Sequence, residues 1–169
     1  PTVNSVNPMF STTTGDCKEV LSSYEENTFH ACITDPPYGM GMDHWDHSVP
    51  TVDIWREVYR TLRPGAFCLA FCSPELYHRL AVNVEDAGFT IKDQIMWMTT
   101  TKMPKHNRLK PAHEPIVVAQ TPYTGSLQSH FDEWGCGIID TTTTRVPWQG
   151  KPPTGWVTGD DNLRTLSRE

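Results

Sequence analysis

The chain has few features that would place it in a membrane or in an oxidising compartment. Hydrophobic residues make up 37% of its 169 positions, and no apolar run approaches the ~20 residues that a membrane-spanning helix needs. No secretory signal opens the sequence. The five cysteines include no Cys-x-x-Cys pair, and Cys68 and Cys72 lie in an apolar run, which favours buried free thiols over disulfides or a metal site. We therefore expect a soluble cytoplasmic protein, without membrane association or bound metal, that has one sizeable core.

Positive charge is also scarce. The chain has 14 lysines and arginines against 20 acidic residues, a net charge of −6, which argues against a general nucleic-acid-binding surface. The charge is uneven, however, because nine consecutive residues without any acid hold four basic side chains: Lys102, Lys105, Arg108 and Lys110. A solvated surface loop and a phosphate-binding loop explain this basic cluster about equally well.

Strand-like and helix-like patterns alternate along residues 1–120. Apolar runs predict strands at 9–14, 29–34, 66–72, 91–98 and 116–120. Apolar residues with helical spacing predict helices at 17–26, 55–62 and 76–84. This order is typical of an α/β fold with a largely parallel sheet and antiparallel strands at one edge. Residues 121–169 contain many Thr, Gly and Pro residues, and we expect them to form an irregular extension.

The motif Asp35-Pro36-Pro37-Tyr38 directly follows the predicted strand at 29–34. Its prolines fix two backbone torsions and remove two N–H donors, so the motif offers carbonyl acceptors, a carboxylate and an aromatic face. At the carboxyl end of a strand in an open α/β sheet, this set suits a flat ring with an amino group, such as a base flipped out of nucleic acid. The same residues also suit a plain strand end, because prolines stop a ladder and Asp favours turns.

Five segments together resemble a known family. In chain order they read Gly-Asp-Cys-Lys-Glu-Val-Leu (15–21), Thr-Asp-Pro-Pro-Tyr-Gly (34–39), Leu-Arg-Pro-Gly (62–65), Lys-Pro-Ala-His-Glu-Pro-Ile-Val (110–117) and Trp-Gly-Cys-Gly-Ile-Ile-Asp (134–140). They look like the N-terminal half of a β-class (permuted) S-adenosylmethionine-dependent DNA amino-methyltransferase. The resemblance implies a partial, permuted, Rossmann-like methyltransferase sheet and methyl transfer to a base of double-stranded DNA. Residues 1–120 would form half of the catalytic core, and residues 121–169 would begin the target-recognition region.

The resemblance also assigns roles to individual residues. Asp35, Pro36, Pro37 and Tyr38 correspond to the catalytic motif that holds the reacting amine. Asp16 and Cys17, together with Asp35, correspond to residues that bind S-adenosylmethionine. Asp16 also suits a helix N-cap, and the two roles are compatible. With DNA as the substrate, the four residues of the basic cluster are predicted to contact phosphates.

The sequence departs from the family in one respect. Full members carry a glycine-rich cofactor motif after the recognition region, and no such motif occurs here. We therefore expect a fragment, one half of a split enzyme or part of a longer polypeptide, with a second segment or chain that carries the glycine motif as its partner.

Three functions remain open from the sequence. Asp35 favours adenine N6 as the acceptor, since cytosine-N4 members more often have Ser at that position. The alternatives are a cytosine-N4 or RNA-base methyltransferase and a non-catalytic DNA-binding subunit. Each would act in the cytoplasm, in the nucleoid or in a phage-infected cell.

Two further polar groups leave alternatives open. The loop at 40–47 holds two histidines and two aspartates, which is weak evidence for a metal site. We favour a flap over the flipped base, with Trp45 as its apolar tip. His113 and Glu114 either position the basic cluster or form a satisfied polar pair at the start of the last strand.

Overall fold

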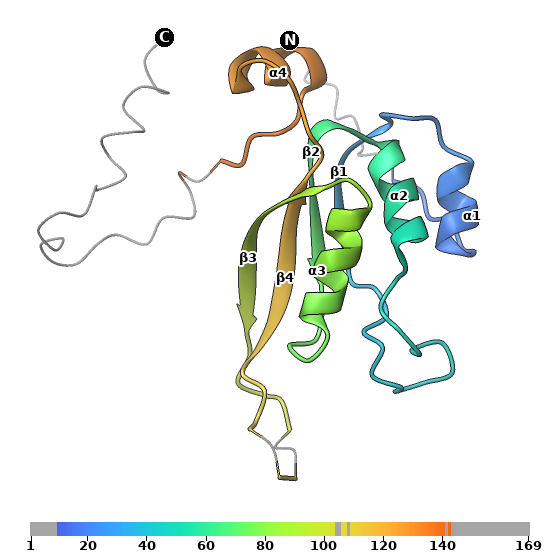
Figure 1. The fold of residues 1–169 in the computed structure, drawn as a ribbon, viewed down its shortest axis with the longest axis vertical. Helices are drawn as coiled ribbons and strands as arrows, with labels where there is room; N and C mark the ends of the chain where they lie inside the picture. The colour runs from blue at the N-terminus through green and yellow to red at the C-terminus, as the bar shows by residue number, and fades with distance from the viewer. Residues whose placement is uncertain (1–9, 104–105, 108, 141, 143–169) are drawn as a thin grey trace, which may run out of the picture. The chain divides into compact units, whose positions relative to one another are not determined.

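The computed structural model describes residues 10–103, 106–107, 109–140 and 142. Residues up to Ile138 belong to one compact unit, which contains the helices and strands of the described part (Figure 1). The helices are α1 (Cys17–Ser22), α2 (Val52–Thr61), α3 (Tyr77–Asp86) and α4 (Leu127–Trp134). The strands are β1 (Phe29–Thr34), β2 (Leu62–Phe71), β3 (Thr90–Met98) and β4 (His113–Gln120).

The four strands form one mixed sheet in the order β1-β2-β4-β3. β1 runs parallel to β2, with Cys32 opposite Cys68. β4 is antiparallel to β2 on one side and to β3 on the other. A parallel pair requires a crossover connection, and α2 supplies it between β1 and β2.

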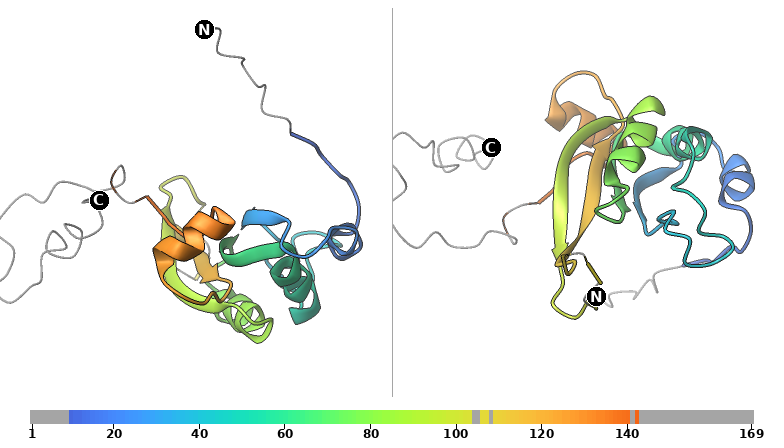
Figure 2. Two further views of the ribbon diagram at one scale, coloured as in Figure 1. Left: turned by 90° about the horizontal axis from the view of Figure 1, so that it is seen from above. Right: turned by 60° about the horizontal axis from the view of Figure 1, so that its bottom comes forward.

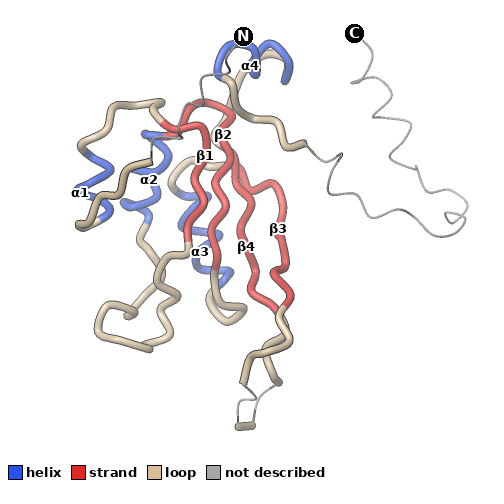
Figure 3. The backbone as a smooth tube through the Cα atoms, turned by 180° about the vertical axis from the view of Figure 1, so that it is seen from behind, coloured by secondary structure: helices blue, strands red, loops and turns tan. Residues whose placement is uncertain are grey.

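Helices α2 and α3 cover one face of this sheet. Figure 3, drawn from behind, shows the strands in front of these two helices. α2 places Trp55 and Val58 on one side of the helix, and α3 places Leu80 and Val84 on one side, as the helical spacing predicts. These side chains pack in one core with residues of β2 and β4. The prediction of buried thiols at Cys68 and Cys72 is confirmed, since both are at most 1% exposed.

Three predictions of regular structure were wrong. Residues 10–14, where a strand was expected, have no regular structure, because no other described strand pairs with them and a strand depends on its ladder. The first helix ends at Ser22 and not at residue 26. The sheet is not largely parallel, because β3 and β4 are joined without the helix that a parallel connection requires. The expected antiparallel pairing at one edge is present, between β2, β4 and β3.

Helix α4 was not expected in the region after residue 120. Ser126 caps its first turn by accepting a hydrogen bond from Ser129 N–H, and Gly135 ends it in a left-handed conformation. The ring of His130 bonds the Pro64 carbonyl at 2.7 Å. This contact holds α4 at the end of the sheet where β2 begins (Figure 2).

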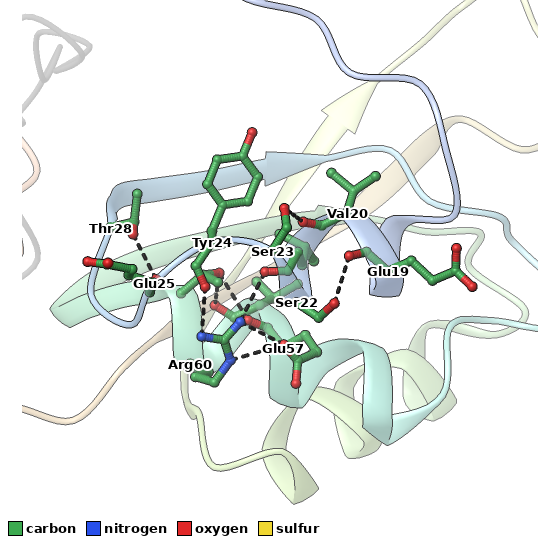
Figure 4. A network of polar contacts seen from close by, with 12 residues as sticks. Glu19, Val20, Ser22, Ser23, Tyr24, Glu25, Thr28, Glu57 and Arg60 are labelled. Atoms are coloured by element: carbon green, nitrogen blue, oxygen red, sulfur yellow. Dashed lines mark hydrogen bonds and ion pairs between the residues drawn. The ribbon is translucent and has the colours of Figure 1, made fainter.

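Arg60 of α2 holds the segment that contains α1 against the rest of the fold (Figure 4). Its guanidinium group donates hydrogen bonds to the backbone carbonyls of Tyr24 at 2.9 Å and Leu21 at 3.0 Å. Glu57, one turn earlier in α2, accepts two more of its hydrogen bonds and fixes its orientation. The side chain of Arg60 is largely buried, so these bonds are shielded from water.

Replacing Arg60 by Met should therefore destabilise the protein. Two carbonyls lose a charged donor, and hydrogen bonds to charged groups contribute about 1.5 to 3 kcal/mol, so we expect a loss of about 2 kcal/mol. Arg56, in the same helix, is the matched control, because its ion pair with Asp53 is more than half exposed and should contribute less than about 1 kcal/mol. Urea unfolding of both variants measures the difference. Equal losses in Arg60→Met and Arg56→Met would contradict this role of Arg60.

Candidate active site

A cavity of about 770 Å³ lies between β1, the start of α1 and α2. It brings together four of the residues that the sequence selected: Asp16, Cys17, Pro36 and Pro37. Asp16 and Cys17 lie at the start of α1, whereas Pro36 and Pro37 follow the end of β1, about 20 positions later in the sequence. The cavity therefore joins the predicted cofactor residues to the predicted catalytic motif, although Asp35 and Tyr38 do not line it.

Asp16 is the N-cap of α1. Its Oδ1 accepts the backbone N–H groups of Lys18 at 2.9 Å and Glu19 at 3.2 Å. Both bonds use the same oxygen, and among the described residues none donates to Oδ2. The capping role is thus confirmed, and Oδ2 remains available to a donor in the cavity.

Tyr38 lies against Asp35 at the end of β1. The Tyr38 hydroxyl lies within the influence of the Asp35 carboxylate. Burial raises the pKa of Tyr38 above its ordinary value, and its interaction with Asp35 and the negative charge of Glu114 raise it further. The phenol therefore stays neutral and remains a hydrogen-bond donor.

Two of the four residues in the basic cluster have protein partners. Lys102 forms a salt bridge with Glu114 at the start of β4, and both side chains are largely buried. Lys110 donates to the Thr100 carbonyl at 2.9 Å. Lys105 and Arg108 lie outside the described residues. Of the two interpretations of Glu114, the one in which it positions the basic cluster agrees with the Lys102 contact.

The loop after the catalytic motif is organised by Asp46, a role that the sequence did not reveal. Asp46 is only 3% exposed, and its carboxylate accepts backbone N–H groups of Gly39, Met40 and Met42.

Within the described part of the chain, no group of three or more His, Cys, Asp or Glu side chains is arranged to hold a metal ion. Trp45 is 59% exposed and reaches the cavity lining.

Trp55 is a second residue whose polar contribution the sequence did not reveal. Its apolar spacing predicted a core position, and it is 1% exposed. It also lines the cavity, and its indole N–H has no hydrogen-bond partner among the described residues. A buried N–H without an acceptor is costly, so this nitrogen is a locally unfavourable feature of the packed core.

None of the helices that the structure describes is both long enough and apolar enough to cross a membrane.

Comparison with known proteins gives the family. The chain is 24% identical over 174 aligned residues to the type II methyltransferase M.HindIII of Haemophilus influenzae. The alignment covers 63% of this chain and 56% of that protein. The structure resembles TTHA0409 of Thermus thermophilus complexed with S-adenosyl-L-methionine, with a TM-score of 0.51, 23% identity and coverage of 70% of this chain and 57% of that one. It also resembles the cytosine-N4-specific PvuII DNA methyltransferase, with a TM-score of 0.51, 16% identity and coverage of 66% and 50%.

The chain spans little more than half the length of these relatives. The structural likenesses confirm the expected fold class, a partial Rossmann-like methyltransferase sheet of mixed α/β type. Residues 29–135, from the start of β1 to the residue after α4, match the family model described as DNA methylase. The chain belongs to this DNA methylase family.

Proposed function

We propose that the protein is a site-specific DNA methyltransferase that transfers a methyl group from S-adenosylmethionine to N6 of an adenine flipped out of the duplex. One observation carries the proposal. Pro36 and Pro37 of the Asp35-Pro36-Pro37-Tyr38 motif line the same cavity as Asp16, in a chain of the DNA methylase family. We further propose that the chain is of the permuted β-class, as its motif order suggests.

The cavity offers groups that suit S-adenosylmethionine. Oδ2 of Asp16 is free to accept from an exocyclic amine such as that of the cofactor's adenine ring, and Cys17 begins the helix beside it. When bound, S-adenosylmethionine supplies a methyl group on a positively charged sulfur.

The catalytic motif would prepare the amine of the target base. That nitrogen is a weak nucleophile because its lone pair is delocalised into the ring. If the Asp35 carboxylate and the Pro36 carbonyl accept its two hydrogens, the nitrogen is free to become pyramidal and to direct its lone pair at the methyl group. Pro37 fixes the backbone between these acceptors and Tyr38.

Tyr38 would hold the base by stacking, which contributes about 1 to 3 kcal/mol per base in comparable sites. Its hydroxyl already interacts with Asp35. A carboxylate has two oxygens and about four acceptor positions, so Asp35 has room for the amine of the base while it keeps its interaction with Tyr38. The Tyr38 hydroxyl would then orient Asp35 before the base arrives.

The rest of the assignment concerns organisation and partners. We propose that residues 1–120 are half of the catalytic core and that residues 121–169 begin the target-recognition region. Because the relatives are almost twice as long as the matched part, we propose that a second segment or chain carrying a glycine-rich motif completes the cofactor site. Double-stranded DNA in the cytoplasm, in the nucleoid or of an infecting phage would be the substrate.

Cytosine N4 is the second candidate acceptor. The PvuII enzyme, which is cytosine-N4-specific, shares this fold, and its substrate presents the same kind of exocyclic amine. Asp35 supports adenine, since cytosine-specific members more often have Ser at that position.

We propose that the basic cluster, Lys102, Lys105, Arg108 and Lys110, contacts DNA phosphates. Lys110 bonds only a neutral carbonyl, whereas Lys102 is already neutralised by Glu114. Replacing Lys110 by Ala should therefore lower the slope of log affinity against log salt by about one unit. The Lys102→Ala change should lower it less. Binding titrations at several salt concentrations test this, and an unchanged slope for Lys110→Ala would place the phosphate contacts elsewhere.

DNA treated with the full-length protein and S-adenosylmethionine should contain N6-methyladenine. Nucleoside mass spectrometry after digestion measures it, with unmethylated phage DNA as the substrate. An Asp35→Ala variant should leave almost no product, because the carboxylate acts on the reacting amine itself. N4-methylcytosine alone would overturn the adenine assignment, and no modified base at all with the wild-type protein would overturn the proposed function.

A further inference from the structure

We propose that Asp46 is a positioning residue for the target base, which acts by fixing the backbone on the C-terminal side of Tyr38. This inference rests on the proposed role of Tyr38 as the stacking platform. Asp46 does not belong to the Asp-Pro-Pro-Tyr motif and lies eight residues after Tyr38 in the sequence.

The carboxylate of Asp46 is bound almost entirely by main-chain groups. Its Oδ1 accepts the Gly39 N–H at 2.6 Å, and its Oδ2 accepts those of Met40 at 3.1 Å and Met42 at 3.2 Å. Burial alone would raise the pKa of Asp46, but these N–H groups, together with that of Tyr38, outweigh it and lower the pKa. The group is therefore a buried carboxylate held by successive N–H donors of one loop.

The backbone of Asp46 closes the same loop. Its carbonyl accepts the Gly41 N–H at 2.8 Å, and its own N–H donates to the Asp43 carbonyl at 3.0 Å. Residues 39–46 thus form a closed ring of hydrogen bonds whose centre is one carboxylate. We call this ring the Asp46 loop.

Gly39 allows the Asp46 loop to pack closely against the wall of the cavity. Its φ angle is +69°, and a Cβ atom at this position would lie 2.9 Å from both the Ser48 Cα and the Val49 N. Ser48 and Val49 line the cavity. Gly41 has a similar φ angle of +66°, but a Cβ atom there would meet nothing within 4 Å. The close approach at Gly39 therefore fixes where the loop sits.

Tyr38 is consequently held from both sides. Pro37 restricts the backbone before it, and the Asp46 loop begins with the residue after it. Because the Tyr38 hydroxyl also reaches Asp35, a shift of this backbone would misplace the stacking ring and the catalytic carboxylate together. Misplacement by about 1 Å costs on the order of 100-fold in rate.

The test compares two aspartates of the same loop in the full-length protein. Asp46→Asn replaces one carboxylate oxygen by an NH2 group, which cannot accept a hydrogen bond from the backbone N–H donors. Asp43→Asn is the control, because Asp43 is more than half exposed and its side chain interacts with the adjacent residues His44 and Trp45. We expect Asp46→Asn to lower kcat/KM for DNA about 10- to 100-fold and to raise the KM for DNA, while the KM for S-adenosylmethionine stays unchanged. Asp43→Asn should stay within about twofold of the wild type.

A double-mutant cycle with Tyr38→Ala separates positioning from general stability. If Asp46 acts through Tyr38, the double variant Asp46→Asn/Tyr38→Ala should be no slower than Tyr38→Ala alone. Independent, multiplicative losses would overturn the proposal. So would equal losses in Asp46→Asn and Asp43→Asn.

Two further measurements decide the point if Asp46→Asn is poorly folded or the wild type proves inactive on DNA. Gly39→Ala should reproduce the rise in KM for DNA, and Gly41→Ala should have a much smaller effect, since only Gly39 meets backbone atoms. Amide hydrogen exchange of residues 38–42 should be faster in Asp46→Asn than in Asp43→Asn, whether or not DNA is methylated. Unchanged exchange would overturn the proposed hold of Asp46 on this backbone, whereas an inactive wild type would refute only the methyltransferase proposal.

Discussion

The parallel pairing of β1 with β2 is the constraint on which the candidate site depends. It requires a crossover, and α2 makes that crossover on one face of the sheet. The crossover brings Arg60 to the backbone carbonyls of the α1 segment, which sets the N-terminus of α1 beside the carboxyl end of β1. The cavity exists because these two termini face it together. Without the pairing, the two motifs would share no site.

Three aspartates near the cavity have different roles because their surroundings differ. Asp16 shares one oxygen with the N-terminus of a helix and keeps the other free. Asp35 is exposed and meets the hydroxyl of Tyr38. Asp46 is buried and saturated with backbone N–H donors. Only the first two retain the capacity to accept hydrogens from a ligand, and the third holds the backbone of the Asp46 loop.

The parts of the fold that the sequence predicted well are those with strong local patterns. Trp55 and Val58 recur at helical spacing, and α2 forms there. The run at 29–34 is followed by Asp35 and two prolines, and β1 ends at Thr34. The direction of β4 was not predictable from its own residues, because strand direction depends on the connection and on the neighbouring strand. Helix α4 was missed since only one of its residues, His130, is buried, which leaves little apolar periodicity to detect.

The site was predictable to a similar extent. Asp16, Cys17, Pro36 and Pro37 were selected from motifs and line one cavity. Asp46 was considered only as a metal ligand, because its actual partners are backbone N–H groups and carry no sequence signal. The unpaired N–H of Trp55 was invisible for the same reason: a hydrogen bond that is not made is a property of the packed structure.

The central claim is that the cavity between Asp16 and the β1 strand end binds S-adenosylmethionine. Calorimetric titration of the full-length protein with S-adenosylmethionine tests it most directly, with Asp16→Ser as the decisive variant. Ser is as good an N-cap as Asp, so this variant should keep α1 and the thermal stability of the wild type. We expect it to bind S-adenosylmethionine at least about tenfold more weakly, because it lacks the second carboxylate oxygen for the cofactor's amine. Wild-type affinity in Asp16→Ser would show that Asp16 serves only as a helix cap and would contradict the assignment of the cavity.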